Sequence, residues 1–92
     1  MKEINREYYG GGDGKAINRH SVRTYIIHNE RIYLDRNLST NPNCFSIWYF
    51  PGGRYGLATY IPVDNKQFFG DGLPWSKIIP IAEKAINKYF KK

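Results

Sequence analysis

The sequence has few of the features that mark membrane, secreted or metal-binding proteins. No segment approaches 18 consecutive apolar residues, so there is no candidate transmembrane helix. The amino-terminal residues lack the apolar stretch of a secretory signal peptide, and a single cysteine, Cys44, excludes a disulfide within the chain. Two histidines and one cysteine are too few for a zinc site without carboxylates from distant segments. These absences lead us to expect a cytoplasmic protein without a metal or other cofactor.

The sequence also lacks a nucleotide-binding motif, although residues 10–15 (GGGDGK) are similar to one. A P-loop has the form G-x-x-x-x-G-K-[S/T]. When Gly14 and Lys15 are aligned with it, Tyr9 stands in place of the first glycine and Ala16 in place of the hydroxyl residue. We interpret the segment as a flexible tether. The alternative is that its backbone N–H groups and Lys15 hold a phosphate of a nucleic-acid chain.

Length and composition predict one small folded domain. The chain has 92 residues, of which 41% are hydrophobic and 16% aromatic, enough for a modest core. Its formal net charge of +6 favours an acidic partner. We expect residues 22–92 to form a single α+β domain and residues 1–21 to form a flexible arm that contains the glycine-rich segment. Ile4 and Tyr8 have helical spacing, which predicts one or two loosely held helical turns within residues 1–9.

Two runs of β-branched and aromatic residues predict a first β-hairpin. Residues 22–27 (VRTYII) and 31–34 (RIYL) are separated by the turn-like sequence His28-Asn29-Glu30. With a loop of two or four residues, strand alternation puts alternate side chains on opposite faces. The predicted core face holds Tyr25, Ile27, Ile32 and Leu34, and the other face holds Thr24, Ile26, His28, Arg31 and Tyr33.

A second hairpin is predicted within residues 44–61. The runs 44–50 (CFSIWYF) and 55–61 (YGLATYI) flank Gly52-Gly53, a dipeptide typical of two-residue hairpin turns. Because both faces are apolar, we expect one to meet a helix and the other to present an aromatic surface or a second apolar cluster. The register groups Phe45, Ile47 and Tyr49 with Ala58 and Tyr60, and it groups Trp48 and Phe50 with Tyr55 and Leu57.

The carboxyl-terminal segment predicts an amphipathic helix. Pro74 is a favoured helix start, and Pro80 is expected either to kink the first turn or to mark the true start. The predicted fold is therefore α+β: a four-stranded antiparallel sheet of two β-hairpins with the C-terminal helix packed on one face. The apolar stripe of this helix consists of Ile78, Ile79, Ala82, Ala85, Ile86, Tyr89 and Phe90.

The strongest indication of function is the mixture of arginine and tyrosine around the first hairpin. Arginine neutralises phosphates and stacks on bases, and tyrosine offers a flat face to unpaired bases. A lysine of the glycine-rich segment and an arginine at the tip of the second hairpin are expected to add outlying contacts. The predicted nucleic-acid or partner-binding residues are Lys15, Arg19, Arg23, Arg31, Tyr33, Arg36 and Arg54.

Catalysis has weaker support in the sequence. Two histidines and a cation can cleave RNA by general acid–base chemistry, and His20 and His28 are the only histidines. However, His28 is predicted beside a turn and His20 ahead of the strand, so nothing in the sequence brings them together. We therefore predict no catalytic residue, while RNase-like chemistry of this pair stays open.

Residues 50–86 resemble the carboxyl-terminal half of HicA-type toxins, which are small RNases with a fold similar to double-stranded-RNA-binding domains. The resemblance lies in Pro51-Gly52-Gly53, in Ile61-Pro62-Val63 and in the helix from Pro74, which match the family's proline–glycine hairpin, VPV strand and terminal helix. The family's catalytic histidine belongs on the strand before that hairpin, where this chain reads Cys44-Phe45-Ser46. The RNase activity is therefore not carried over.

Three functions remain open. The first is a small module that binds RNA or DNA by phosphate contacts and aromatic stacking, without catalysis. The second is a protein-binding inhibitor or accessory protein of the phage or mobile-element type that docks on a nucleic-acid-processing enzyme, since arginine and tyrosine are also typical of protein interfaces. The third is a small RNase-like toxin. The expected partner is thus nucleic acid or an acidic protein surface, and not a membrane.

Overall fold

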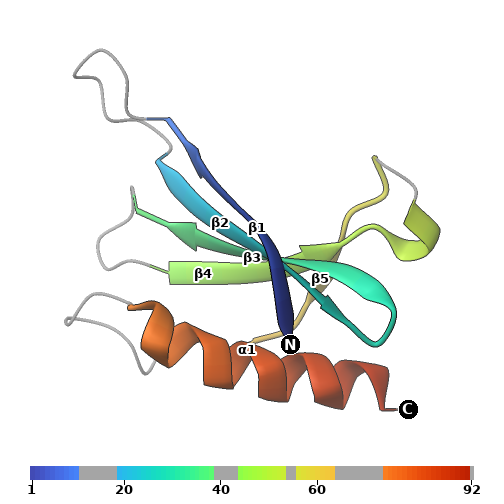
Figure 1. The fold of residues 1–92 in the computed structure, drawn as a ribbon. Helices are drawn as coiled ribbons and strands as arrows, with labels where there is room; N and C mark the ends of the chain where they lie inside the picture. The colour runs from blue at the N-terminus through green and yellow to red at the C-terminus, as the bar shows by residue number, and fades with distance from the viewer. Residues whose placement is uncertain (11–18, 39–43, 54–55, 64–73, 92) are drawn as a thin grey trace.

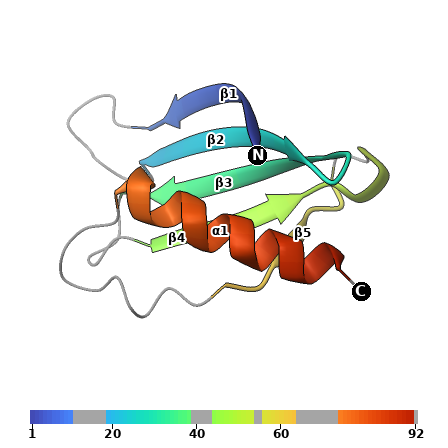
Figure 2. The same ribbon diagram turned by 60° about the horizontal axis from the view of Figure 1, so that its bottom comes forward.

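Five β-strands and one long α-helix make up the structure, a computed structural model that describes residues 1–10, 19–38, 44–53, 56–63 and 74–91. The strands form one antiparallel sheet in chain order, and α1 lies across one of its faces (Figures 1 and 2). The α+β class and the C-terminal helix are confirmed, but the sheet has five strands rather than four. The strands are β1 (Lys2–Tyr9), β2 (His20–Ile27), β3 (Glu30–Asn37), β4 (Cys44–Tyr49) and β5 (Thr59–Ile61), and the helix is α1 (Trp75–Phe90).

The extra strand is β1, in the segment for which helical turns were predicted. It pairs with β2 from Lys2 opposite Ile26 to Tyr9 opposite His20. Two isolated helical turns are marginal in water, whereas pairing along β2 satisfies backbone N–H and C=O groups. The division of the chain into an arm of residues 1–21 and a domain of residues 22–92 stays a prediction.

The β2–β3 hairpin has a two-residue loop, one of the two loop lengths considered. Ile27 pairs with Glu30, and the two loop residues His28 and Asn29 have φ angles of 54° and 62°. Positive φ at both loop residues is the geometry of a type I′ turn, whose twist matches that of paired strands. The predicted core face is confirmed by Tyr25, Ile32 and Leu34, which are buried, and by Ile27, which packs against them.

The predicted two-residue Gly-Gly hairpin between β4 and β5 is wrong. Tyr49 pairs with Thr59, so residues 50–58 form the connection, and Pro51–Gly53 form a short 3₁₀ turn. A two-residue turn at Gly52-Gly53 would need a backbone N–H from Pro51, and proline has none. Ile47 consequently pairs with Ile61, three residues beyond the predicted partner Ala58. An odd shift moves every β5 side chain to the other face, so Ile61 enters the core and Tyr60 leaves it.

Helix α1 buries the predicted stripe against the sheet. Ile78, Ala82 and Ile86 are fully buried, and the other predicted stripe residues pack around them. The helix begins directly after Pro74, whose carbonyl accepts the first helical hydrogen bonds from Lys77 and Ile78. Pro80 is an internal residue and does not mark the helix start. No helix among the described residues is long and apolar enough to cross a membrane.

Burial of Tyr49 beneath α1 makes the stability of the fold sensitive to alkaline pH. The Tyr49 and Tyr89 hydroxyls lie 3.4 Å apart, and this hydrogen bond, together with burial, raises the pKa of Tyr49 to about 12. The folded state therefore favours the neutral phenol. This contribution to the free energy of unfolding is fully present below about pH 10, the ordinary phenol pKa, and is lost as the pH rises through about 12.

We expect the free energy of unfolding to fall less steeply with rising pH in Tyr49→Phe than in the wild type. The measurement is a series of urea titrations between about pH 9 and about pH 12. The substitution keeps the ring, which packs edge-on against Tyr89 and Phe90, and removes only the titrating hydroxyl. Equal slopes for the two proteins would contradict the effect assigned to Tyr49.

Candidate nucleic-acid interface

The two faces of the sheet differ in what lies on them. Side chains alternate between the face covered by α1 and the opposite face, which we call the open face because no described helix packs on it (Figure 2). Pairing across the sheet puts Thr24, Tyr33, Trp48 and Tyr60 in one row, directly opposite one another on β2, β3, β4 and β5. Since directly paired residues share a face, this row lies on the open face, where Thr24 at its β2 end is buried.

Three rings on the open face form one aromatic cluster. Tyr33 and Trp48 are stacked, with ring centroids 4.2 Å apart and planes 11° from parallel. Phe50 meets both edge-on, with its centroid 5.8 Å from that of Tyr33 and 5.4 Å from that of Trp48. Next in the row, Tyr60 is 66% exposed. The expected aromatic surface is therefore present, and stacked and edge-on contacts hold its rings in place.

A concave pocket lies at one edge of this cluster. Its volume is about 500 Å³, and it includes the exposed cation Arg31 between the β2–β3 turn and the Pro51–Gly53 turn. Its aromatic walls suit a flat ligand, and its charged lining is mixed, with the cation of Arg31 beside the carboxylate of Glu30. The pocket is lined by Ile26, Asn29, Glu30, Arg31, Tyr33, Phe50, Gly52 and Gly53.

The predicted binding residues are divided between the two faces. Arg31 and Tyr33 lie on the open face, where they were predicted. Arg23 and Arg36 belong to the face on which α1 packs, because they pair with the core residues Leu34 and Phe45. Arg19 lies two residues before Ser21, the β2 partner of Arg36, and its backbone carbonyl accepts a hydrogen bond from Leu38. Lys15 and Arg54 lie outside the described residues.

Arg23 and Arg36 form a basic group near the start of α1. The guanidinium carbon of Arg23 lies 4.3 Å from the centroid of the Trp75 ring, a cation–π contact. Burial, and to a smaller degree the charge of Arg23, lowers the pKa of the Arg36 guanidinium from its ordinary value. Arg23 therefore serves to hold Trp75 against the sheet. These arginines do not share a surface with Arg31 and Tyr33.

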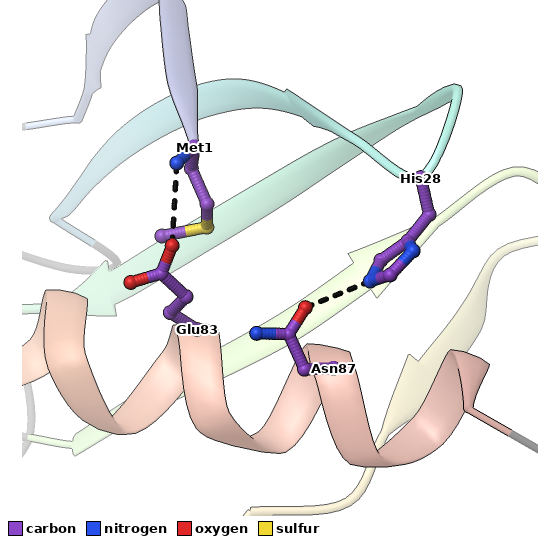
Figure 3. Close-up of polar contacts among 4 residues, drawn as sticks. All are labelled: Met1, His28, Glu83 and Asn87. Atoms are coloured by element: carbon purple, nitrogen blue, oxygen red, sulfur yellow. Dashed lines mark hydrogen bonds and ion pairs between the residues drawn. The ribbon is translucent and has the colours of Figure 1, made fainter.

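The two histidines have separate roles at opposite ends of β2. They are about 26 Å apart along the strand, too far to act on one substrate bond. His28 was predicted on the face away from the core, but Figure 3 shows it turned toward α1. Its Nε2 donates a hydrogen bond to Asn87 Oδ1 (2.7 Å), and its ring lies 5.3 Å from that of Phe90. One turn earlier on the same side of the helix, Glu83 forms an ion pair with the Met1 amino group (3.3 Å; Figure 3).

His20 is held by a carboxylate on the open face. Its Nδ1 donates to Asp35 Oδ1 at 2.7 Å, and both residues border a pocket of about 90 Å³ that Cys44 and Ser46 also line. Ser46 pairs directly with Asp35, so the carboxylate stands between the hydroxyl and the imidazole. A catalytic serine would need the imidazole as its immediate neighbour. No group of three His, Cys, Asp or Glu side chains suited to a metal ion occurs among the described residues.

Three residues of the open face, Trp48, Phe50 and Tyr60, are absent from the predicted set of binding residues. Trp48 and Phe50 were predicted to share an aromatic face but were given no role. Tyr60 was placed on the core face, because the predicted hairpin register was wrong by an odd number of residues. The sequence did hold a signal for this surface, because residues 44–50 are apolar on both faces of their strand. A single helix can cover only one of these faces, so the other face must present its apolar side chains elsewhere.

No family model, no curated protein and no solved structure matches this chain. The resemblance of residues 50–86 to HicA-type toxins thus stays an expectation.

Proposed function

We propose that this protein binds single-stranded nucleic acid on the open face of its sheet, without catalysing a reaction. The observation that carries the proposal is the row of aromatic side chains across β3, β4 and β5, which borders a cavity containing Arg31. An open sheet face with aromatic rings can stack unpaired bases, and a neighbouring cation can neutralise their phosphates. We further propose a cytoplasmic location, on the basis of the single cysteine.

Each part of the open face has a role in the proposal. Tyr60 offers a free ring on which a base can stack, because it is the most exposed aromatic residue of the row. The stacked pair of Tyr33 and Trp48 forms a rigid neighbouring platform, so little side-chain freedom is lost on binding. Arg31 supplies a positive charge for the nucleic-acid backbone.

Titration with labelled oligonucleotides tests the proposal. We expect fluorescence anisotropy to report binding of single-stranded RNA or DNA, and binding of the duplex of the same sequence to be weaker because its bases are already stacked. If three phosphates are neutralised, raising the salt concentration fourfold should weaken binding by about 20-fold. Arg31→Gln should reduce the slope of log affinity against log salt by about 0.7.

Trp48 supplies an internal reporter for the same titration. In a Trp75→Phe variant, Trp48 is the only remaining tryptophan, so quenching on binding reports contact at the open face. Absence of binding to single strands at low salt would reject the proposed function. The next experiment would then be a search for a protein partner, because tyrosine, tryptophan and arginine are also the residues that dominate protein interfaces.

A further inference from the structure

Strand β1 forms an exposed edge of the sheet. One of its sides pairs with β2, and no other described strand pairs with its second side. An edge strand presents unpaired N–H and C=O groups that can pair with another chain. Every residue of β1 except Glu3 is exposed, and Ile4, Tyr8 and Tyr9 are among the most exposed large hydrophobic residues of the protein. This edge is therefore a candidate interaction surface.

The bulge in β1 determines which of its residues can face a partner strand. Pairing shifts between Glu3 and Asn5, so Ile4 has no partner on β2. The first five positions of the ladder consequently hold Lys2, Glu3, Asn5, Arg6 and Glu7, and Tyr8 and Tyr9 follow them. The charges of these first five positions read plus, minus, neutral, plus, minus. When the series is read in reverse about Asn5, a negative charge stands at each position that held a positive one, and a positive charge at each position that held a negative one.

A second copy of β1, reversed and centred on Asn5, would therefore meet opposite charges at each charged position. Lys2 would face Glu7 of the second copy. Glu3 would face Arg6 of the second copy, and each of these two residues also forms an ion pair with the other within its own strand. In a two-fold antiparallel pair, one residue lies opposite its own copy at the axis. Any charged member at the axis would set like charges directly opposite. The uncharged Tyr8 and Tyr9 end the strand, and a register centred on either of them would leave Lys2 and Glu3 without partners on the second copy, so Asn5 is the axis that pairs the most charges.

We propose that the protein forms a two-fold symmetric dimer in which β1 pairs antiparallel with β1 of a second copy, in the register centred on Asn5. The two sheets then form one continuous sheet. Because the axis runs perpendicular to the sheet, both helices lie on one side and both open faces on the other. The proposal does not depend on the function of the open face.

Sedimentation equilibrium from about 1 µM to about 1 mM measures the dimer directly. We expect the wild-type protein to pass from monomer to dimer within this range. Lys2→Glu sets two carboxylates opposite each other at both ends of the interface, and Glu7→Lys sets two ammonium groups opposite each other there. Each variant should raise the dissociation constant by about tenfold or more, since two attractive pairs become repulsive in every dimer.

The decisive measurement is an equal mixture of the two variants. A mixed dimer has no repulsive pair at either end: at one end the two substituted positions face each other with opposite charges, and at the other end the native Lys2 and Glu7 face each other. The mixture should therefore dimerise as tightly as the wild type, while each variant alone does not. Lys84→Glu is the matched control for charge, because Lys84 is exposed on α1 and is not part of β1. It should leave the dissociation constant unchanged.

Three results would overturn the proposal. The first is a wild-type protein that stays monomeric at about 1 mM. The second is a Lys84→Glu variant that weakens the dimer as much as Lys2→Glu. The third is a mixture that associates no better than the separate variants, which would reject this register. Recovery in the mixture would also show that both variants are folded.

Discussion

Replacing Ile47 by alanine is expected to lower the free energy of unfolding by about 2–5 kcal/mol. Ile47 has no exposed surface and stands on β4, between Leu34 of β3 and Ile61 of β5, within the core covered by α1. Removing three of its side-chain carbons loses buried apolar surface and leaves a cavity that neighbouring strands cannot fill without breaking their pairing. A small domain with a modest core has little stability to spare.

Chemical denaturation monitored by tryptophan fluorescence measures this change. Ile4→Ala is the matched control, because Ile4 is 42% exposed at the bulge of β1, and it should change the free energy of unfolding by less than about 1 kcal/mol. Ile47→Val should give an intermediate loss of about 0.5–1.5 kcal/mol. Equal effects of the two alanine substitutions would mean that Ile47 is not part of the central core.

Replacing Tyr60 by alanine is expected to weaken binding of single-stranded nucleic acid by about 5- to 100-fold, which is the contribution of one base stacked on an aromatic ring. Tyr60 pairs with Trp48 at the end of the aromatic row and is 66% exposed, so its removal should scarcely change stability. The measurement is the dissociation constant from anisotropy at constant salt concentration.

Tyr8→Ala is the control for this experiment. Tyr8 is 58% exposed, close to the value for Tyr60, but it pairs with Ser21 on the side of the sheet that α1 covers. Its loss should leave the dissociation constant within about twofold of the wild-type value. If both alanine variants bind as the wild type does, the open face does not bind the nucleic acid and the proposed function fails.

Part of the candidate interface could be predicted from local sequence. Strand alternation in residues 31–34 put Arg31 and Tyr33 away from the core, and the structure agrees. The grouping of Arg23 and Arg36 with them was based on closeness in the sequence, and the structure separates the two pairs. Alternation separates residues that are near in sequence, because neighbouring side chains of a strand point to opposite faces.

The sequence by itself determined the first hairpin, the amphipathic helix and the α+β class. Each follows from a local pattern: the period of a strand in residues 22–34, the period of a helix after Pro74, and turn residues that accept positive φ.

Only the tertiary structure decided the two edges of the sheet. Residues 2–9 became a strand because β2 offered an unpaired edge, and β5 took its register because Ile61 fills the core beside Ile47 while Pro51 cannot close a tight turn. Both outcomes depend on contacts between residues far apart in the chain, which no local pattern records. Those contacts put Tyr60 on the open face and aligned the charges of β1 for a second copy.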